Sequence, residues 1–250
     1  MRLGYAIANE KIINDIKGLS PTSLNQTQTK GTVPKIVLFG DHVTALPEES
    51  FQNSQVDFVL SGGDYDFLLL NLCNFLDIKG LSPQLANPKE TKGTVPGNIE
   101  LEPGIYYRDN GQIKNTGKFQ LNHDLNSLPF IDRDLTHWQL YAHKNGNYKR
   151  TPGTYIMSGR DCWWGRCSFC SWITLYTNYR VKKPELVADE IGFLIGNYNI
   201  KTIFDDTGTF PIGDWLREFC KILIDRDYNK KIDFSCNARF GSLSLSDYKF

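Results

Sequence analysis

The chain has 250 residues, which gives room for one large domain or two small ones. Its 28 basic and 28 acidic residues cancel, so bulk charge gives no reason to expect a nucleic acid or a membrane surface as partner. The most apolar segment, residues 67–76, is too short to span a bilayer. Six cysteines without a signal-peptide pattern favour a reducing compartment, and we expect a cytoplasmic location.

The first 76 residues are predicted to alternate strands and helices. Residues 1–14 form a loosely periodic helix, and residues 35–40 and 56–60 have the apolar runs of buried strands. Residues 41–49 follow the first strand as a loop and the start of a helix, and a second helix covers residues 65–76. Both strands end at glycine, and this strand–loop–helix order is typical of a parallel α/β sheet.

Two short motifs occur twice, with copies 62 residues apart. Residues 15–21 recur as 77–83, and residues 29–34 recur as 91–96. The residues between the paired motifs are rich in Gln, Thr, Asn and Pro, which disfavours a packed core. Because two copies are too few for a stacked solenoid, we expect two inserted, mostly disordered loops of about twenty residues.

Residues 97–150 are predicted to connect two structured regions. Within them, residues 104–108 and 109–113 form a hairpin around the Asn110-Gly111 turn. Residues 128–134 precede the next strand–helix pattern. We expect no independent chemistry from this connector.

The last hundred residues repeat the order strand, loop, helix three times. The apolar positions of the first helix, such as Val187 and Ile191, lie on one stripe, and Pro184 fits its first turn. Right-handed connections would curl such units into part of a barrel. The predicted strands are residues 154–158, 201–204 and 231–236, and the predicted helices are residues 184–198, 213–227 and from Leu243 onward.

Three of the six cysteines, Cys162, Cys167 and Cys170, fall within nine residues after the first of these strands. Thiolates on one loop are the ligands that iron–sulfur clusters need, and three of them would leave one iron of a 4Fe-4S cluster open. A structural zinc site would want a fourth Cys or His, and the nearest upstream histidine is His143. A disulfide would need an oxidising compartment.

The cysteine segment resembles the cluster loop of radical S-adenosylmethionine enzymes. Their usual pattern is Cys, three residues, Cys, two residues, Cys, with an aromatic residue before the last Cys. Phe169 and the Cys167–Cys170 spacing match, whereas four residues separate Cys162 from Cys167. Longer first gaps occur in relatives that carry a cobalamin-type N-terminal domain, so we interpret this loop as a variant.

Residues 40–47 and 62–66 resemble the second half of the cobalamin-binding Rossmann-like domain that precedes many radical S-adenosylmethionine barrels. The resemblance implies a corrin near the strand ends, where glycine lets a ligand approach the backbone. The axial-ligand motif Asp-x-His-x-x-Gly is missing, and a loop histidine bonded to backbone is the alternative for His42. The candidate cobalamin-binding residues are Gly40, His42, Thr44, Gly62 and Gly63.

The same resemblance implies a set of S-adenosylmethionine-binding residues at the strand ends. Asp206, Thr207 and Gly208 stand where the family places a Gly-Gly-Glu-like segment. Asn237 and Arg239 follow the third strand, within reach of a ribose or a carboxylate of the ligand. The alternatives are a helix-capping turn for the aspartates and a salt bridge for Arg239. The candidates are Phe169, Asp206, Thr207, Gly208, Asn237 and Arg239, whereas Cys73, Cys220 and Cys236 are predicted to be buried apolar residues.

The predicted fold class is α/β, with both implied domains incomplete. Residues 1–76 correspond to a partial Rossmann-like cobalamin-binding domain with an insert at about 15–34, residues 77–150 to an inserted loop and connector, and residues 151–250 to the first three βα units of a radical S-adenosylmethionine barrel. Residues 128–134 resemble the Leu-Pro-x-x-Asp linker that leads into that barrel. We therefore expect the chain to be a fragment, a split gene product or a pseudogene-like remnant.

The resemblance implies reductive cleavage of S-adenosylmethionine to a 5′-deoxyadenosyl radical by a 4Fe-4S cluster. With cobalamin, methyl transfer or a rearrangement of a small-molecule substrate would follow. An electron donor such as flavodoxin or ferredoxin is the implied partner. Two alternatives stay open: a non-catalytic iron–sulfur or zinc-binding remnant of such an enzyme, and a cobalamin carrier module alone.

Overall fold

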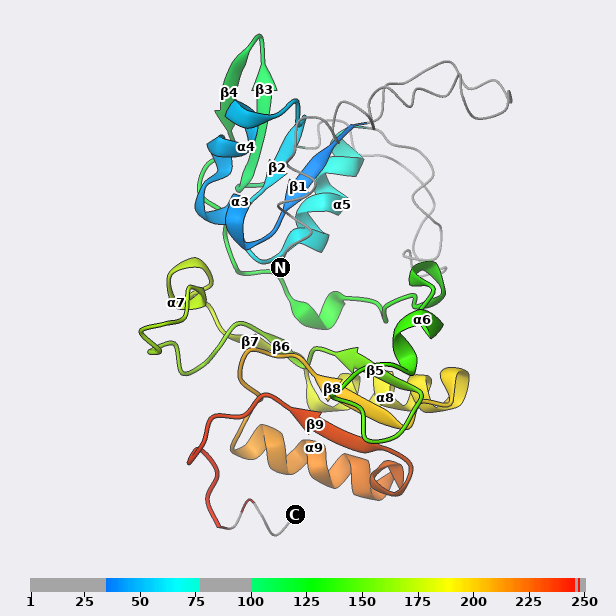
Figure 1. The fold of residues 1–250 in the computed structure, drawn as a ribbon. Helices are drawn as coiled ribbons and strands as arrows, with labels where there is room; N and C mark the ends of the chain where they lie inside the picture. The colour runs from blue at the N-terminus through cyan, green and yellow to red at the C-terminus, as the bar shows by residue number, and fades with distance from the viewer. Residues whose placement is uncertain (1–34, 77–99, 246, 248–250) are drawn as a thin grey trace, which may run out of the picture. The chain divides into compact units, whose positions relative to one another are not determined.

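The computed structural model describes residues 35–76, 100–245 and 247. The helix expected at residues 1–14 and both copies of the repeated motifs lie outside these ranges. The chain divides into two compact units, residues 1–123 and 124–250, each with its own sheet (Figure 1). The domain boundaries expected at residues 76 and 150 stay a prediction.

The first unit is built on a four-stranded mixed sheet of order β1-β2-β3-β4. As predicted, β1 (Val37–Phe39) and β2 (Phe58–Leu60) are parallel. The hairpin expected at the Asn110-Gly111 turn is also present, and it extends this sheet as the antiparallel strands β3 (Ile105–Asp109) and β4 (Gln112–Asn115). Both turn residues have positive φ, the backbone conformation that a tight two-residue hairpin requires.

Helices pack on both faces of the first sheet. The short helices α3 (Asp41–Ala45) and α4 (Pro47–Asn53) bury Val43 and Phe51 against Val59 of β2. Helix α5 (Tyr65–Phe75) contributes a second apolar cluster with Leu60 of β2 and Ile105 of β3. These two clusters hold the ends of β1 and β2 in place.

The second unit has a three-stranded parallel sheet of order β5-β8-β9. Its strands are β5 (Gly153–Ile156), β8 (Thr202–Asp205) and β9 (Asp233–Cys236), close to the predicted positions. Helices α8 (Pro184–Tyr198) and α9 (Asp214–Asp225) share one core with the sheet, in which Ile191, Ile203 and Phe219 are buried. The carboxyl ends of the three strands therefore meet at one edge.

A two-residue strand pair closes the base of the cysteine segment. Strands β6 (Gly159–Arg160) and β7 (Arg180–Val181) are antiparallel and flank residues 161–179, which include the short helix α7 (Trp172–Leu175). A Cβ atom at Gly159 would lie 2.5 Å from the carbonyl oxygen of Arg180, so only glycine permits this approach. The shorter elements before β5 and β9 are η3 (Leu125–Ser127), η4 (Asp134–Thr136), α6 (Gln139–Ala142) and η5 (Tyr228–Lys230).

A buried ion pair attaches the segment before β5 to the second unit's core. Arg133 and Glu190 are only 4% and 2% exposed, and their nearest charged atoms lie 3.3 Å apart. The guanidinium also donates to Thr154 Oγ1 at 3.0 Å and to the Tyr155 carbonyl at 2.8 Å. Lys182 Nζ lies 3.4 Å from the second oxygen of Glu190. The Arg133 side chain thus connects residues 128–134 to both β5 and α8.

Removing one partner of this pair is expected to destabilise the second unit strongly. Glu190→Ala leaves the Arg133 charge buried without its carboxylate, and we expect the free energy of unfolding to fall by about 3–5 kcal/mol, measured by urea unfolding. The double variant Arg133→Met/Glu190→Leu is expected to lose less, because the buried Arg133 charge is removed together with its carboxylate and only the partly exposed Lys182 loses a partner. Asp189→Ala, which breaks an exposed pair with Arg226, serves as control and should cost about 1 kcal/mol or less.

Candidate functional site

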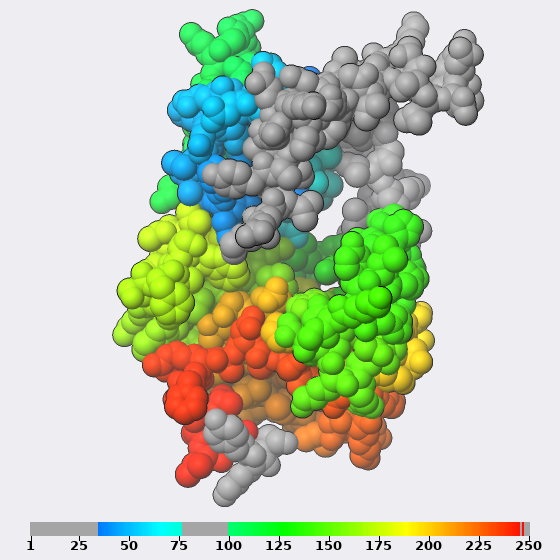
Figure 2. Space-filling view, viewed as in Figure 1, coloured from blue at the N-terminus to red at the C-terminus, as the bar shows by residue number. Residues whose placement is uncertain are grey.

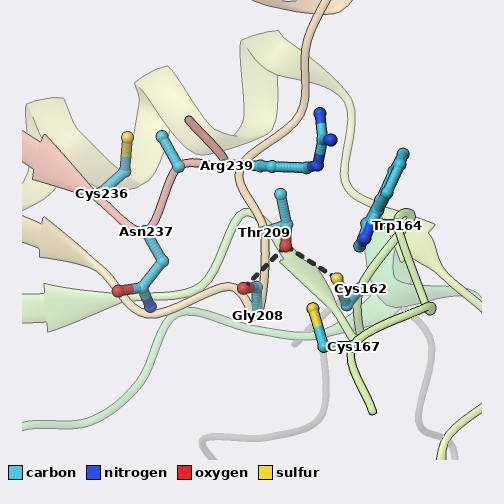
Figure 3. A pocket seen from close by; sticks show the side chains of 9 residues that line it. Cys162, Trp164, Cys167, Gly208, Thr209, Cys236, Asn237 and Arg239 are labelled. Carbon is cyan, nitrogen blue, oxygen red and sulfur yellow. Dashed lines mark hydrogen bonds between the residues drawn. The ribbon is translucent and has the colours of Figure 1, made fainter. Parts of the chain in front are cut away.

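The loops that follow the three parallel strands of the second unit surround a pocket of about 460 Å³. Figure 2 shows the cysteine segment, in yellow-green, beside the segment after β9, in red, on one face of this unit. Carboxyl ends of parallel strands are the usual place for ligand sites in α/β proteins. The pocket is lined by Cys162, Trp164, Cys167, Gly208, Thr209, Cys236, Asn237, Ala238 and Arg239 (Figure 3).

The buried carboxylate of Asp205 joins the ends of β5 and β8. One of its oxygens accepts hydrogen bonds from the backbone N–H of Ser158, at 2.9 Å, and from the Ser158 hydroxyl. Its other oxygen accepts from the N–H of Thr207 at 2.9 Å. Desolvation raises the pKa of Asp205, although these hydrogen bonds oppose the shift. Two of the three loops that line the pocket, those after β5 and β8, therefore begin at one fixed point.

The cysteine segment is bound along its length to the loop after β8. The sulfur of Cys162 lies 2.8 Å from the hydroxyl oxygen of Thr209. Trp163 Nε1 donates to the Phe210 carbonyl at 3.1 Å, and the Tyr179 hydroxyl donates to the Thr209 carbonyl at 3.2 Å. These contacts come from both ends of the segment, so its position is set by the loop after β8.

The thiols of Cys162, Cys167 and Cys170, which are close together in the sequence, have the chemistry of iron–sulfur cluster ligands. Cys162 and Cys167 line the pocket, and the N–H of Cys170 donates to the Cys167 carbonyl at 3.0 Å in a tight turn. All six cysteines lie within the described residues and carry free thiols. In the part of the chain that the structure describes, no three His, Cys, Asp or Glu side chains are gathered around one metal position. The cluster ligands stay a prediction.

The thiol of Cys236 is the third that lines the pocket, beside those of Cys162 and Cys167. Burial, together with the negative charges of Asp205 and Cys220, raises the pKa of Cys236 to about 11. In Figure 3 its sulfur points away from those of Cys162 and Cys167. These properties favour a protonated thiol beside the site over a fourth cluster ligand.

Two arginines lie over the ring of Trp164. The guanidinium carbon of Arg239 is 3.6 Å from the ring centroid, and that of Arg166 is 5.2 Å away. Such cation–π contacts hold a guanidinium in place without consuming its N–H groups. The salt bridge that was the alternative for Arg239 is not found among the described residues.

Three of the six predicted S-adenosylmethionine-binding residues line the pocket: Gly208, Asn237 and Arg239. Thr207 is fully buried, and its hydroxyl accepts a hydrogen bond from the Gly159 N–H at 2.9 Å. Asp206 does not line the pocket, but its Oδ1 lies 3.3 Å from Nδ2 of Asn237. Phe169 is 90% exposed and also lies outside the lining.

The helix-capping alternative for the aspartates is not found. Helix α9 begins at Asp214 after the N-cap residue Gly213, and no side chain caps it. Sequence reasoning missed three lining residues: Thr209, Cys236 and Ala238. The available signal was position, because each of them lies within a few residues of a strand end.

The candidate cobalamin residues of the first unit meet at the ends of β1 and β2. Thr44 joins the two ends, since its hydroxyl donates to the Gly40 carbonyl at 2.8 Å and accepts from the Gly62 N–H at 3.1 Å. A Cβ atom at Gly62 would lie 2.7 Å from the ring of Phe119, so this glycine makes room for the chain's own side chain. At Gly40, no atom of the described residues lies within 4 Å of the position that a Cβ atom would take. His42 Nε2 lies 3.0 Å from a carboxylate oxygen of Glu49.

Comparisons with known proteins find distant relatives. No protein-family model matches the chain. An uncharacterized methyltransferase of Pyrococcus horikoshii is 27% identical over 179 residues, which cover 70% of this chain and 34% of that protein. An anaerobic magnesium-protoporphyrin IX monomethyl ester cyclase of Cereibacter sphaeroides is 24% identical over 206 residues, covering 81% and 30%. The chain thus spans about a third of the length of the curated relatives it matches.

Two solved structures share the fold. The cobalamin-dependent S-adenosylmethionine radical enzyme OxsB with aqua-cobalamin bound matches with a TM-score of 0.58 and 17% identity, over 85% of this chain and 28% of that one. Its apo, selenomethionine-labelled form matches with a TM-score of 0.52 and 19% identity, over 80% and 26%. These matches confirm the predicted resemblance and the mixed α/β class with parallel strands.

No helix in the described part of the chain is long and apolar enough to cross a membrane.

The raised pKa of Cys236 predicts slow alkylation that accelerates with pH. Because the thiolate is the nucleophile, a pKa of about 11 in place of 9.0 lowers the rate at pH 8 about 100-fold. Between pH 8 and 10 the iodoacetamide rate should rise about tenfold per pH unit, measured by peptide mass spectrometry. The same cysteine in urea is the control, and its rate should level off near pH 9. A levelling near pH 9 in the folded chain would contradict the prediction.

Proposed function

We propose that the chain forms part of a radical S-adenosylmethionine enzyme in which Cys162, Cys167 and Cys170 hold a 4Fe-4S cluster. The observation that carries the proposal is the pocket at the strand ends, because two of these thiols line it together with the loops after β8 and β9. A cluster held by three cysteines would have one iron without a protein ligand, and Gly208, Asn237 and Arg239 line the same pocket. S-adenosylmethionine is the ligand that we assign to this pocket.

The chain's own residues bind and orient the ligand. Nδ2 of Asn237 donates to the Thr207 carbonyl at 3.2 Å and lies near Asp206, which leaves its Oδ1 to accept from a ribose hydroxyl. The guanidinium of Arg239 matches a carboxylate, and the Trp164 ring holds it in place over the pocket. When bound, the cluster supplies the electron that cleaves the sulfonium, and an external flavodoxin or ferredoxin would deliver it.

Cobalamin binding is the proposed role of the first unit. Support comes from the fold shared with OxsB and from the position of Gly40, Thr44 and Gly63 at the ends of two parallel strands. Because Phe119 fills the space beside Gly62, the corrin would approach at Gly40, where a Cβ position meets no atom of the described residues within 4 Å. His42 is paired with Glu49, and we assign it no axial-ligand role.

The reaction that would follow, methyl transfer or a rearrangement, belongs to the whole protein. The chain matches about a third of the length of its curated relatives, so the match leaves most of those proteins, and any substrate contacts there, uncompared. The rival function is a cluster- or zinc-binding protein without S-adenosylmethionine chemistry. It differs from the proposal in one property, since its metal site would not respond to S-adenosylmethionine.

The cluster proposal is tested by anaerobic reconstitution and EPR of the dithionite-reduced chain, with and without S-adenosylmethionine. We expect a 4Fe-4S signal that changes when S-adenosylmethionine is added. Cys162→Ala, Cys167→Ala and Cys170→Ala should each lose most of the iron, because each removes one thiolate ligand. Cys220→Ala, on α9 and away from the pocket, is the matched control and should retain it.

Two results would contradict the proposed function, one by ruling out the ligand S-adenosylmethionine and the other by ruling out the cluster. A cluster signal that S-adenosylmethionine leaves unchanged favours the rival function. Bound zinc, or no metal at all, shows that these three cysteines do not hold a cluster in this chain.

The cobalamin proposal is tested with hydroxocobalamin. We expect the pigment to co-elute with the chain in gel filtration and His42→Ala to bind equally well, because His42 is engaged by Glu49. The absorption spectrum of the bound pigment should be the same for both proteins. Failure of the unaltered chain to retain the pigment would overturn this part of the proposal, and a spectral change in the variant would restore His42 as a ligand.

A further inference from the structure

We propose that Thr209 is a positioning residue that donates a hydrogen bond to the sulfur of Cys162 when that sulfur binds the cluster, and that this bond raises the cluster's reduction potential. The inference rests on the proposed 4Fe-4S site and adds a residue that tunes it. Thr209 stands outside the set of residues that the sequence resemblance implies.

The contact is short and its surroundings are well packed. The Thr209 hydroxyl oxygen lies 2.8 Å from the Cys162 sulfur, and Thr209 is only 7% exposed (Figure 3). The Thr209 carbonyl accepts from the Tyr179 hydroxyl, and the next residue, Phe210, donates its N–H to the Asn237 carbonyl at 2.8 Å. The backbone is thus held from two sides, and the hydroxyl stays next to the sulfur.

The Thr209 hydroxyl has one hydrogen, and the position of this hydrogen decides whether Thr209 or Cys162 is the donor in their contact. The same oxygen lies 2.9 Å from the Gly208 carbonyl, so a protonated Cys162 thiol can donate to Thr209 while Thr209 donates to Gly208. A sulfur that binds iron carries no proton. Only Thr209 can then supply the hydrogen, and its hydroxyl turns from the Gly208 carbonyl to the Cys162 sulfur.

A hydrogen bond to a ligand sulfur stabilises the reduced, more negative form of a cluster, which raises its potential. Within the described residues, neither Cys167 nor Cys170 has a hydroxyl at hydrogen-bonding distance from its sulfur. The effect would therefore act at one of the three ligands. Removing the hydroxyl should alter the potential without removing the cluster.

The test compares valine, alanine and serine at position 209. Thr209→Val keeps the shape of the side chain and removes the hydroxyl, Thr209→Ala removes it with a smaller side chain, and Thr209→Ser retains it. The matched control is Thr174→Val, because the Thr174 hydroxyl lies in the same segment but donates to the Ser171 carbonyl. The readout is the midpoint potential of the reconstituted cluster, from an EPR-monitored redox titration without S-adenosylmethionine.

We expect both Thr209→Val and Thr209→Ala to lower the midpoint potential. The ratio of reduced to oxidised cluster at a fixed potential should fall about tenfold, which is about 59 mV for a one-electron couple. Thr209→Ser and Thr174→Val should match the unaltered chain. Resonance Raman spectra should show a shift of the Fe–S(Cys) stretch on transfer to D₂O that both hydroxyl-free variants lack.

The two proposals fail in different ways. Hydroxyl-free variants with a full cluster and an unchanged midpoint potential overturn the role of Thr209 and leave the cluster proposal standing. The absence of a cluster in the unaltered chain overturns both. If Thr209→Val and Thr209→Ala lose the cluster while Thr209→Ser keeps it, the hydroxyl is required for assembly, and the proposed tuning role is overturned.

Discussion

The second unit depends on one buried carboxylate. Asp205 ends β8, and its two oxygens bind the start of the loop after β5, at Ser158, and the start of the loop after β8, at Thr207. Thr207 in turn accepts from Gly159, the first residue of β6. Because every pocket residue from the cysteine segment and from the loop after β8 follows one of these anchors, their relative positions are set before any cofactor binds. Buried polar groups arranged in this way specify one geometry.

Beyond these anchors, the cysteine segment and the loop after β8 are joined by further contacts. The cysteine segment provides soft sulfur donors, and the loop after β8 provides the hydroxyl and carbonyl groups that hold Cys162, Trp163 and Tyr179. A Cβ atom at Gly208 would lie 2.5 Å from the Asp161 carbonyl, so this glycine allows the two backbones to touch. The residues after β9 then close the pocket through the contact of Arg239 with Trp164.

Much of this architecture is predictable because its signals are local. The bounds of α8 follow from Pro184 in its first turn and from an apolar stripe at helical spacing, and the three parallel strands follow from short apolar runs. The three cysteines identify their segment by spacing alone. Each of these signals is contained in a stretch of about fifteen residues or fewer, which is the range over which periodicity and turn chemistry act.

The missed features are tertiary. Thr209 is singled out by its contact with Cys162, and these two residues are 47 positions apart in the chain. Gly62 was expected to admit a corrin, whereas the space beside it holds Phe119, a residue from beyond the hairpin. Strands β6 and β7 have two residues each, too few for an alternating pattern to appear. Sequence patterns therefore pointed to the strand ends where the candidate pocket lies, and packing decided which side chains line it.

The clamp formed by β6 and β7 has an evolutionary consequence. It brings residues 160 and 180 together, so the ends of the intervening loop stay fixed whatever its internal length. Since closure entropy grows only slowly with length, one more residue inside such a loop has little thermodynamic effect. The four-residue gap between Cys162 and Cys167 is then a spacing that the paired strands accommodate. Insertions in the first half of the loop are therefore tolerated, because the pairing of its two ends keeps β6 and β7 in register.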